Sequence, residues 1–133
     1  MAKSDLPRPT DAELAILRVL WQQGPSTVRE VRDVLERLQP TGYTTVLKLL
    51  QIMTEKGLVL RDESRRTHIY RTSRSEAQTQ RQMVGDLVRR AFGGSALKLV
   101  MQALAAKKAS YEDLAEIRKL IENLEREREG GDL

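Results

Sequence analysis

The sequence predicts a mostly α-helical fold with one small β-hairpin. Apolar residues recur at intervals of three and four along most of the 133-residue chain, which is the spacing of helices with one buried face. Residues 58–71 are the exception, because two short extended runs there flank a polar segment. We therefore expect two parts, residues 1–74 with the hairpin and residues 75–133 with helices alone.

The composition restricts the possible functions. Hydrophobic residues make up 40% and charged residues 32%, which suits a folded, soluble protein. With no Cys and one His, disulfides, thiolate metal sites and multi-histidine sites are excluded, and we expect no cofactor and no enzymatic activity. The chain has no long apolar run and its N-terminus lacks the layout of a signal peptide, so we expect a cytoplasmic protein without membrane insertion.

The first helix is predicted between Thr10 and Gly24. Thr10 and Glu13 have capping-box spacing at its start, and Gly24 with Pro25 ends it. Trp21 could stack on a base, but its spacing favours a core position. The predicted apolar residues of this helix are Leu14, Ile16, Leu17, Leu20 and Trp21.

A second helix is predicted from Thr27, which again has capping-box spacing to Glu30. We expect it to end just before Pro40, and a short turn through Gly42 leads to a third helix. Two amphipathic helices joined by a tight turn form a helix-turn-helix. The predicted apolar face of the second helix consists of Val28, Val31, Leu35 and Leu38.

The third helix, between Gly42 and Gly57, has an apolar side and a polar side. A helix of about 15 residues is about 22 Å long and fits the major groove of DNA. We interpret it as a recognition helix. Its apolar side consists of Val46, Leu49, Leu50 and Met53, and its polar side includes Thr44, Lys48, Gln51 and Glu55.

The extended runs 58–61 and 67–71 form the predicted hairpin, with residues 62–66 as its loop. A hairpin directly after a recognition helix makes a winged helix, with Arg65 and Arg66 at the tip of the wing. A charged tip can also be a simple solvated loop. We expect Ile69 and Tyr70 to be packing residues.

Positive charge is concentrated in the third helix and the hairpin. Residues 41–74 hold seven Lys or Arg and three Asp or Glu, and this surplus of four equals the net charge of the whole chain. Residues 1–40 hold six of each sign and residues 75–133 hold ten of each. A polyanion would therefore dock on residues 41–74.

We expect double-stranded DNA to be the partner of this basic region. Side chains at the front of the third helix would face base edges and phosphates, and arginines of the wing would add a salt-sensitive contact. The predicted DNA-binding residues are Tyr43, Thr44, Thr45, Lys48, Arg61, Arg65 and Arg66.

Three further amphipathic helices are predicted after Ser75, separated by Gly93 with Gly94 and by Lys107 with Lys108. Their apolar stripes need a partner, and a second copy of the chain is the simplest one. Packing onto the winged domain is the alternative. The predicted dimerisation residues are Leu97, Val100, Met101, Leu104, Leu114, Ile117, Ile121 and Leu124.

The chain resembles the penicillinase repressor family at residues 43–46, at Leu50 and Met53, at residues 56–59 and at Tyr70. Residues 10–31 look like the first two helices of that family. The resemblance implies a homodimeric winged-helix repressor on a palindromic operator, with the C-terminal helices forming the dimer. It also implies that a membrane sensor-protease triggers cleavage in the C-terminal part.

Three features depart from the family pattern. Many members carry Arg where this chain has Ile52, so the contact that this arginine could make with the DNA backbone does not carry over to this chain. The absence of Cys excludes the copper-responsive branch. The Asn-Phe pair of the best-known cleavage site is absent, and Gln102 with Ala103 is its nearest counterpart by spacing. A winged-helix protein-interaction adapter and a repressor released by a small ligand remain as alternatives.

Overall fold

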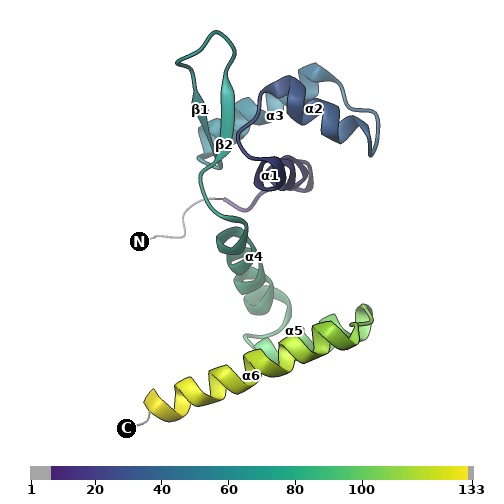
Figure 1. Ribbon diagram of the computed structural model, residues 1–133, viewed down its shortest axis with the longest axis vertical. Coiled ribbons are helices and arrows are strands. Elements are labelled where there is room, and N and C mark those ends of the chain that lie inside the picture. Colours follow the sequence, from purple (N-terminus) through teal and green to yellow (C-terminus); the bar gives the residue numbers. More distant parts are fainter. Residues whose placement is uncertain (1–6, 132–133) are drawn as a thin grey trace. The chain divides into compact units, whose positions relative to one another are not determined.

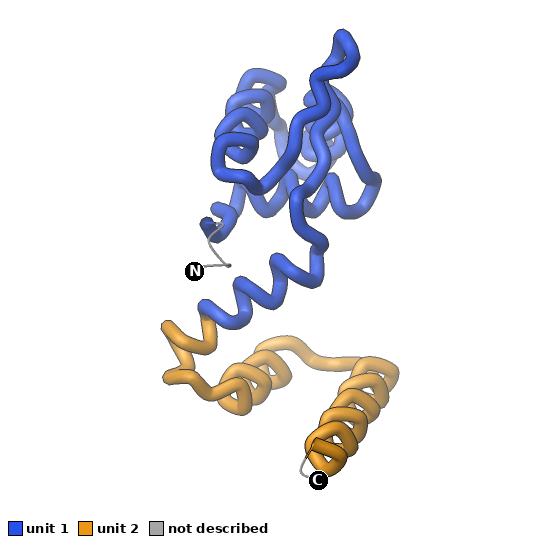
Figure 2. Tube along the Cα trace, turned by 90° about the vertical axis from the view of Figure 1, so that its left-hand side faces the viewer, with its two compact units in different colours: residues 1–86 blue, residues 87–133 orange. Residues whose placement is uncertain are grey.

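The computed structural model describes residues 7–131, which contain six helices and one two-stranded antiparallel sheet (Figure 1). The chain divides into two compact units at Asp86 and Leu87 (Figure 2). This composition of elements confirms the predicted fold class. In chain order the elements are α1 (Asp11–Gln23), α2 (Val28–Glu36), α3 (Tyr43–Lys56), β1 (Val59–Asp62), β2 (Ile69–Thr72), α4 (Glu76–Ala91), α5 (Ala96–Ala106) and α6 (Tyr111–Gly131).

The core of the first unit lies between α1, α2, α3 and the hairpin, whose strands run side by side in Figure 1. Each helix contributes its apolar stripe and the hairpin contributes Tyr70, which is 1% exposed. The fully or nearly buried apolar residues are Ile16, Leu17, Val19, Leu20, Val28, Val31, Leu35, Val46, Leu50, Met53, Leu58, Val59 and Tyr70.

Capping boxes start α1 and α2 as the sequence predicts, and a third one starts α4. At α1 the backbone N–H of Thr10 donates to Glu13 Oε1 at 2.9 Å, and the N–H of Glu13 donates to Thr10 Oγ1 at 3.2 Å. Thr27 and Glu30 repeat these two bonds at α2. Ser75 makes the equivalent exchange with the Gln78 side chain before α4.

The second helix is shorter than predicted, and Leu38 is not part of its apolar face. Helix α2 ends at Glu36, and Leu38 is 80% exposed in the turn that follows. The N–H groups of Leu38 and Gln39 both donate to Leu35 O, so the chain tightens and leaves the helix before Pro40. Leu38 therefore loses the 3.6-residue register that would have pointed it at the core.

The hairpin is joined by a third extended segment that the sequence pattern did not indicate. Strands β1 and β2 pair with Val59 opposite Thr72 and Asp62 opposite Ile69. On the other side of β2, Ser26 and Tyr70 exchange two backbone hydrogen bonds of 2.9 and 2.8 Å. The link between α1 and α2 thus covers the free edge of β2 at Tyr70.

Trp21 is a packing residue of the first unit, as the spacing favours. Its side chain packs against the core, and the indole N–H donates to Arg74 O at 3.0 Å. This bond ties α1 to the segment between β2 and α4. The first turns of α4 also belong to this unit, since Thr79 is 6% exposed and Asp86 pairs with Arg8 at 3.0 Å.

The second unit contains the end of α4 and helices α5 and α6. Gly93 and Gly94 both have positive φ and end α4, and the N–H of Gly94 donates to Val88 O at 2.9 Å. The side chains of Ser95 and Ser110 accept from backbone N–H groups at the starts of α5 and α6. Neither helix has a buried residue. Within residues 7–131, no helix is both long and apolar enough to span a bilayer.

Candidate nucleic-acid interface

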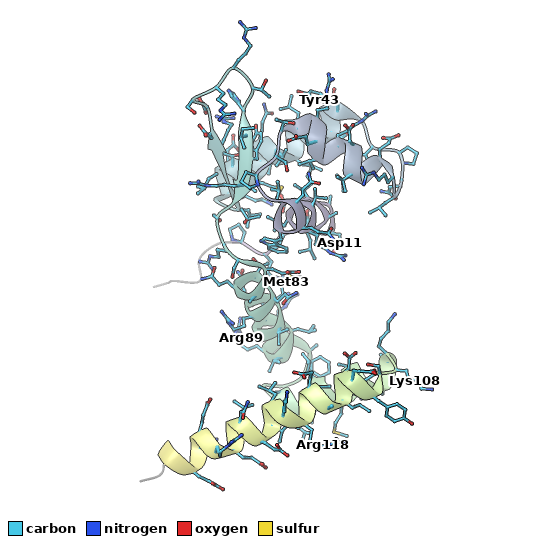
Figure 3. The ribbon with its side chains drawn as sticks, viewed as in Figure 1. Asp11, Tyr43, Met83, Arg89, Lys108 and Arg118 are labelled. Carbon is cyan, nitrogen blue, oxygen red and sulfur yellow. The ribbon has the colours of Figure 1, made fainter. Side chains whose placement is uncertain are left out.

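Helix α3 separates a buried side from an exposed polar side. Val46, Leu50 and Met53 are 0% exposed, whereas Thr44 and Lys48 are exposed. Of the predicted contact residues on this helix, Thr45 is also exposed and Tyr43, labelled at the start of α3 in Figure 3, is 50% exposed. The four residues predicted to face DNA from α3 are therefore all accessible.

A short set of contacts on α2 holds the turn that leads into α3. Arg32 Nε donates to Thr41 O at 3.3 Å, and the N–H of Thr41 donates to Glu36 Oε1 at 2.9 Å. Arg32 also lies 3.8 Å from Glu36. These contacts fix the residue before Gly42, the N-cap of α3, which has no side chain to accept a hydrogen bond from the N–H groups of the first turn.

The other end of α3 is anchored to α1. Lys56 Nζ lies 2.7 Å from Glu13 Oε2, and Glu13 is 2% exposed. Burial acts to raise the pKa of Glu13, but the hydrogen bonds and charge of Lys56, with the bonds to Thr10, outweigh it and lower the pKa. The carboxylate therefore stays charged inside the unit.

Helix α3 ends in a left-handed turn at Gly57, which has φ 83°. Its N–H donates to Thr54 O at 3.1 Å, and the N–H of Leu58 donates to Met53 O at 2.9 Å. This is the Schellman arrangement that glycine favours because it has no Cβ. The turn directs the chain from α3 straight into the hairpin.

The three arginines predicted for the wing are not equivalent. Arg61 is on β1, where its Nε lies 2.7 Å from Glu63 Oε2. Hydrogen bonds with the Tyr70 side chain and with Glu63 raise the pKa of Arg61. Arg65 and Arg66 are exposed in the loop between the strands. Arg61 is therefore partly neutralised within the wing, while the two loop arginines are exposed.

Ser64 holds the loop of the wing in a tight turn. Its backbone N–H donates to Asp62 Oδ1 at 2.9 Å. Hydrogen bonds from Ser64, aided by the charges of Arg65 and Arg71, lower the pKa of Asp62. The carboxylate thus organises the tip on which the two exposed arginines are carried.

A groove of about 480 Å³ lies between the start of α2, the start of α3 and the hairpin. It brings Tyr43 and Arg66, two predicted contact residues, to one place. It also contains Arg29 and His68, which are not among the residues predicted to bind DNA. The lining residues are Thr27, Val28, Arg29, Tyr43, Leu47, Arg66, Thr67, His68 and Tyr70.

Arg29 lies in the first turn of α2, the helix before α3. The charge distribution along the sequence does not indicate Arg29, because residues 1–40 balance in charge as a whole. Thr44, Thr45 and Lys48 lie outside the groove, farther along the exposed side of α3, and Arg61 and Arg65 do not line it either.

The predicted dimerisation residues lie on α5 and α6, and most are exposed. The exposed fractions range from 37% at Leu114 to 67% at Leu97, and Ile117 is half-buried. The other residues of this set that are exposed are Val100, Met101, Leu104, Ile121 and Leu124.

The first unit is thus a winged helix-turn-helix domain with an exposed polar front on α3 and arginines on its wing. Residues 9–123 match the family described as penicillinase repressor, and the chain belongs to this family. Ile52 is half-buried on α3, so it does not belong to the fully exposed front of this helix.

Among individual relatives, the transcriptional regulator BlaI of Mycobacterium tuberculosis is 41% identical over 71 residues, which are 53% of this chain and 50% of that protein. The chain thus spans half the length of this relative. The penicillinase repressor of Bacillus licheniformis is 21% identical over 117 residues, covering 88% of this chain and 91% of the relative.

Two solved structures are similar to the chain. The solution structure of the DNA-binding domain of the repressor BlaI has a TM-score of 0.49 at 25% identity, and covers 58% of this chain and 92% of that domain. The crystal structure of the transcriptional regulator Tm0710 from Thermotoga maritima has a TM-score of 0.48 at 18% identity. The match covers 92% of this chain and 78% of that chain.

Proposed function

We propose that this chain is a sequence-specific, DNA-binding transcriptional repressor that binds a palindromic operator as a homodimer. The observation that carries the proposal is the exposed front of α3 beside the arginines of the wing, within the segment that holds the whole charge surplus. A buried apolar side holds the helix while Thr44, Thr45 and Lys48 are free to meet base edges. Membership of the penicillinase repressor family supports the same function.

The wing supplies the sequence-independent part of the interaction. Arg65 and Arg66 are exposed in its loop, whereas Arg61 is paired with Glu63 and contributes less. Contacts of arginine with phosphates release condensed counterions, so the affinity depends strongly on salt. Base contacts from α3 would then select the operator among DNA sites that the wing binds indiscriminately.

Dimerisation through α5 and α6 is the second part of the proposal. The stripe Leu114, Ile117, Ile121 and Leu124 has the 3,4,3 spacing of a coiled-coil seam. Neither α5 nor α6 has a buried residue in the single chain, so both helices leave apolar surface that a partner would cover. A symmetric pair would present two recognition helices to the two halves of a palindrome.

Release from the operator by a membrane sensor-protease system belongs to the proposal as well. Gln102 and Ala103 are exposed, but both lie inside α5. A protease binds extended backbone, so cleavage between them requires α5 to unwind locally. An 11-residue helix without buried side chains opens easily. Dimer contacts on the same helix would protect it from cleavage.

The proposal is tested by selecting genomic fragments on the purified protein and measuring their binding at several salt concentrations. We expect a palindromic site and, if six to ten phosphates are contacted, a fall in affinity of about 10³ to 10⁵ between 50 and 200 mM salt. K48A should weaken operator binding by about 1 to 3 kcal/mol. Recovery of no fragment would favour a protein-interaction adapter, and operator release by a small molecule alone would replace the proteolytic route.

A further inference from the structure

We propose that Arg29 is a further DNA-contact residue, which binds a backbone phosphate in the groove together with Arg66. This inference rests on the proposed DNA-binding function and names a contact that the recognition helix and wing alone do not supply. It assigns to α2 a role in holding the DNA strand that passes the start of α3.

The groove brings together residues from three elements that are distant in the sequence. Arg29 is in the first turn of α2, Tyr43 is the first residue of α3, and Arg66 is in the loop of the wing. Its volume of about 480 Å³ leaves room for a phosphate with its neighbouring sugars. The floor includes the buried residues Val28 and Tyr70, so a polar group entering it must be bound by the groups at the rim.

The chemistry of the rim suits an anion. None of the nine lining residues is acidic, while Arg29, Arg66 and His68 carry nitrogen donors and Thr27 and Thr67 carry hydroxyls. Guanidinium groups bind phosphate oxygens through two parallel N–H donors, which is stronger and more directional than a single contact.

The ion pairs of the first unit leave these two arginines available. Within residues 7–131, neither Arg29 nor Arg66 makes an ion pair, in contrast to Arg32 one turn along α2, which is paired with Asp33 and Glu36. Arg61 of the wing is likewise paired with Glu63. Both guanidiniums that line the groove are thus without an ion pair in the described part of the chain.

The position of the groove argues for the DNA backbone rather than a base. Tyr43 lines it, whereas Thr44, Thr45 and Lys48 do not. A strand whose bases face those three residues must carry its phosphates along one side of α3, and the groove lies at the start of that helix. Contact with a phosphate holds the DNA without reading its sequence.

The test compares R29A with R18A, a matched control that also removes one exposed arginine without an ion pair in the described chain but lies on α1 outside the groove. Affinities for a selected operator fragment and for random-sequence duplex are measured over a salt series. R29A should weaken binding to both DNAs by a similar factor and reduce the slope of log affinity against log salt by about one, while R18A leaves the slope unchanged.

A double-substitution cycle with R66A tests the shared phosphate. If Arg29 and Arg66 hold one phosphate, the double variant loses less binding free energy than the sum of the losses in R29A and R66A. Additive losses would overturn the shared contact. The phosphate assignment would be overturned if R29A behaved like R18A, or if R29A weakened binding to the operator but not to random-sequence duplex. If the wild-type protein bound random duplex as tightly as any selected fragment, the proposed repressor function would fail, yet the comparison of salt slopes would still decide the role of Arg29.

Discussion

Lys56 in the last turn of α3 and Glu13 in the first turn of α1 form an ion pair of 2.7 Å across 43 positions of the chain. The Glu13 carboxylate also accepts a hydrogen bond from the backbone N–H of Thr10, so one buried side chain both caps α1 and anchors α3. The orientation of α3 in the first unit therefore depends on a contact made by neither its apolar side nor its polar front.

We predict that K56A destabilises the protein by about 1 to 3 kcal/mol, because it leaves the buried carboxylate of Glu13 without its charged partner. K48A is the matched control on the same helix, since Lys48 is exposed and has no ion pair within the described residues. The free energies of unfolding of both variants can be measured in urea. Equal values for K56A and K48A would contradict the anchoring role.

Acid should lower the free energy of unfolding partly because it protonates the Glu13 carboxylate. The folded pKa of Glu13 lies below its ordinary value of 4.5, so its ionised form contributes stability above that pH, and the contribution is lost as the pH falls through the folded pKa. We expect E13Q to be less stable than the wild type at neutral pH and to lose less stability on acidification. The free energies of unfolding of E13Q and the wild type can be measured in urea from pH 7 down to about pH 3. An equal dependence on pH for the two proteins would refute this assignment.

G57A should destabilise the protein by about 1 to 2 kcal/mol, because φ at Gly57 is 83° and a Cβ is strained in that region. G130A is a control for the substitution itself, since Gly130 is in α6, has no positive φ and leaves open space around an added Cβ. Thermal unfolding compares the two. If G57A lost no more thermal stability than G130A, the turn after α3 would not need glycine.

I121D should convert the proposed dimer into a monomer, because it places a charge in the middle of the apolar stripe of α6, where Ile121 is 50% exposed in the single chain. N123D adds the same charge two residues away, where Asn123 accepts a hydrogen bond from Arg126 outside that stripe. Sedimentation at equal concentrations measures the mass of each. If I121D formed a dimer of unchanged stability, α6 would not be part of the interface.

A good part of the fold could be predicted from the sequence because its signals are local. Capping residues act over three positions, and helical stripes repeat within four, so Thr10, Thr27 and Ser75 mark real helix starts and Gly57 a real helix end. The prediction for Leu38 was wrong because the pattern continues past Glu36 while the backbone does not. Periodicity shows which residues would share a face, but not where hydrogen bonding stops the helix.

By itself, the sequence determined the order of the helices and the hairpin, the buried side of α3 and the concentration of positive charge in residues 41–74. Only the tertiary structure decided that Lys56 reaches Glu13, that Ser26 pairs with Tyr70, and that Arg29 shares a groove with Arg66. Each of these pairs joins residues more than 30 positions apart. Local preferences act over a few neighbouring residues, whereas contacts at that separation depend on how the whole domain packs its helices and hairpin around one core.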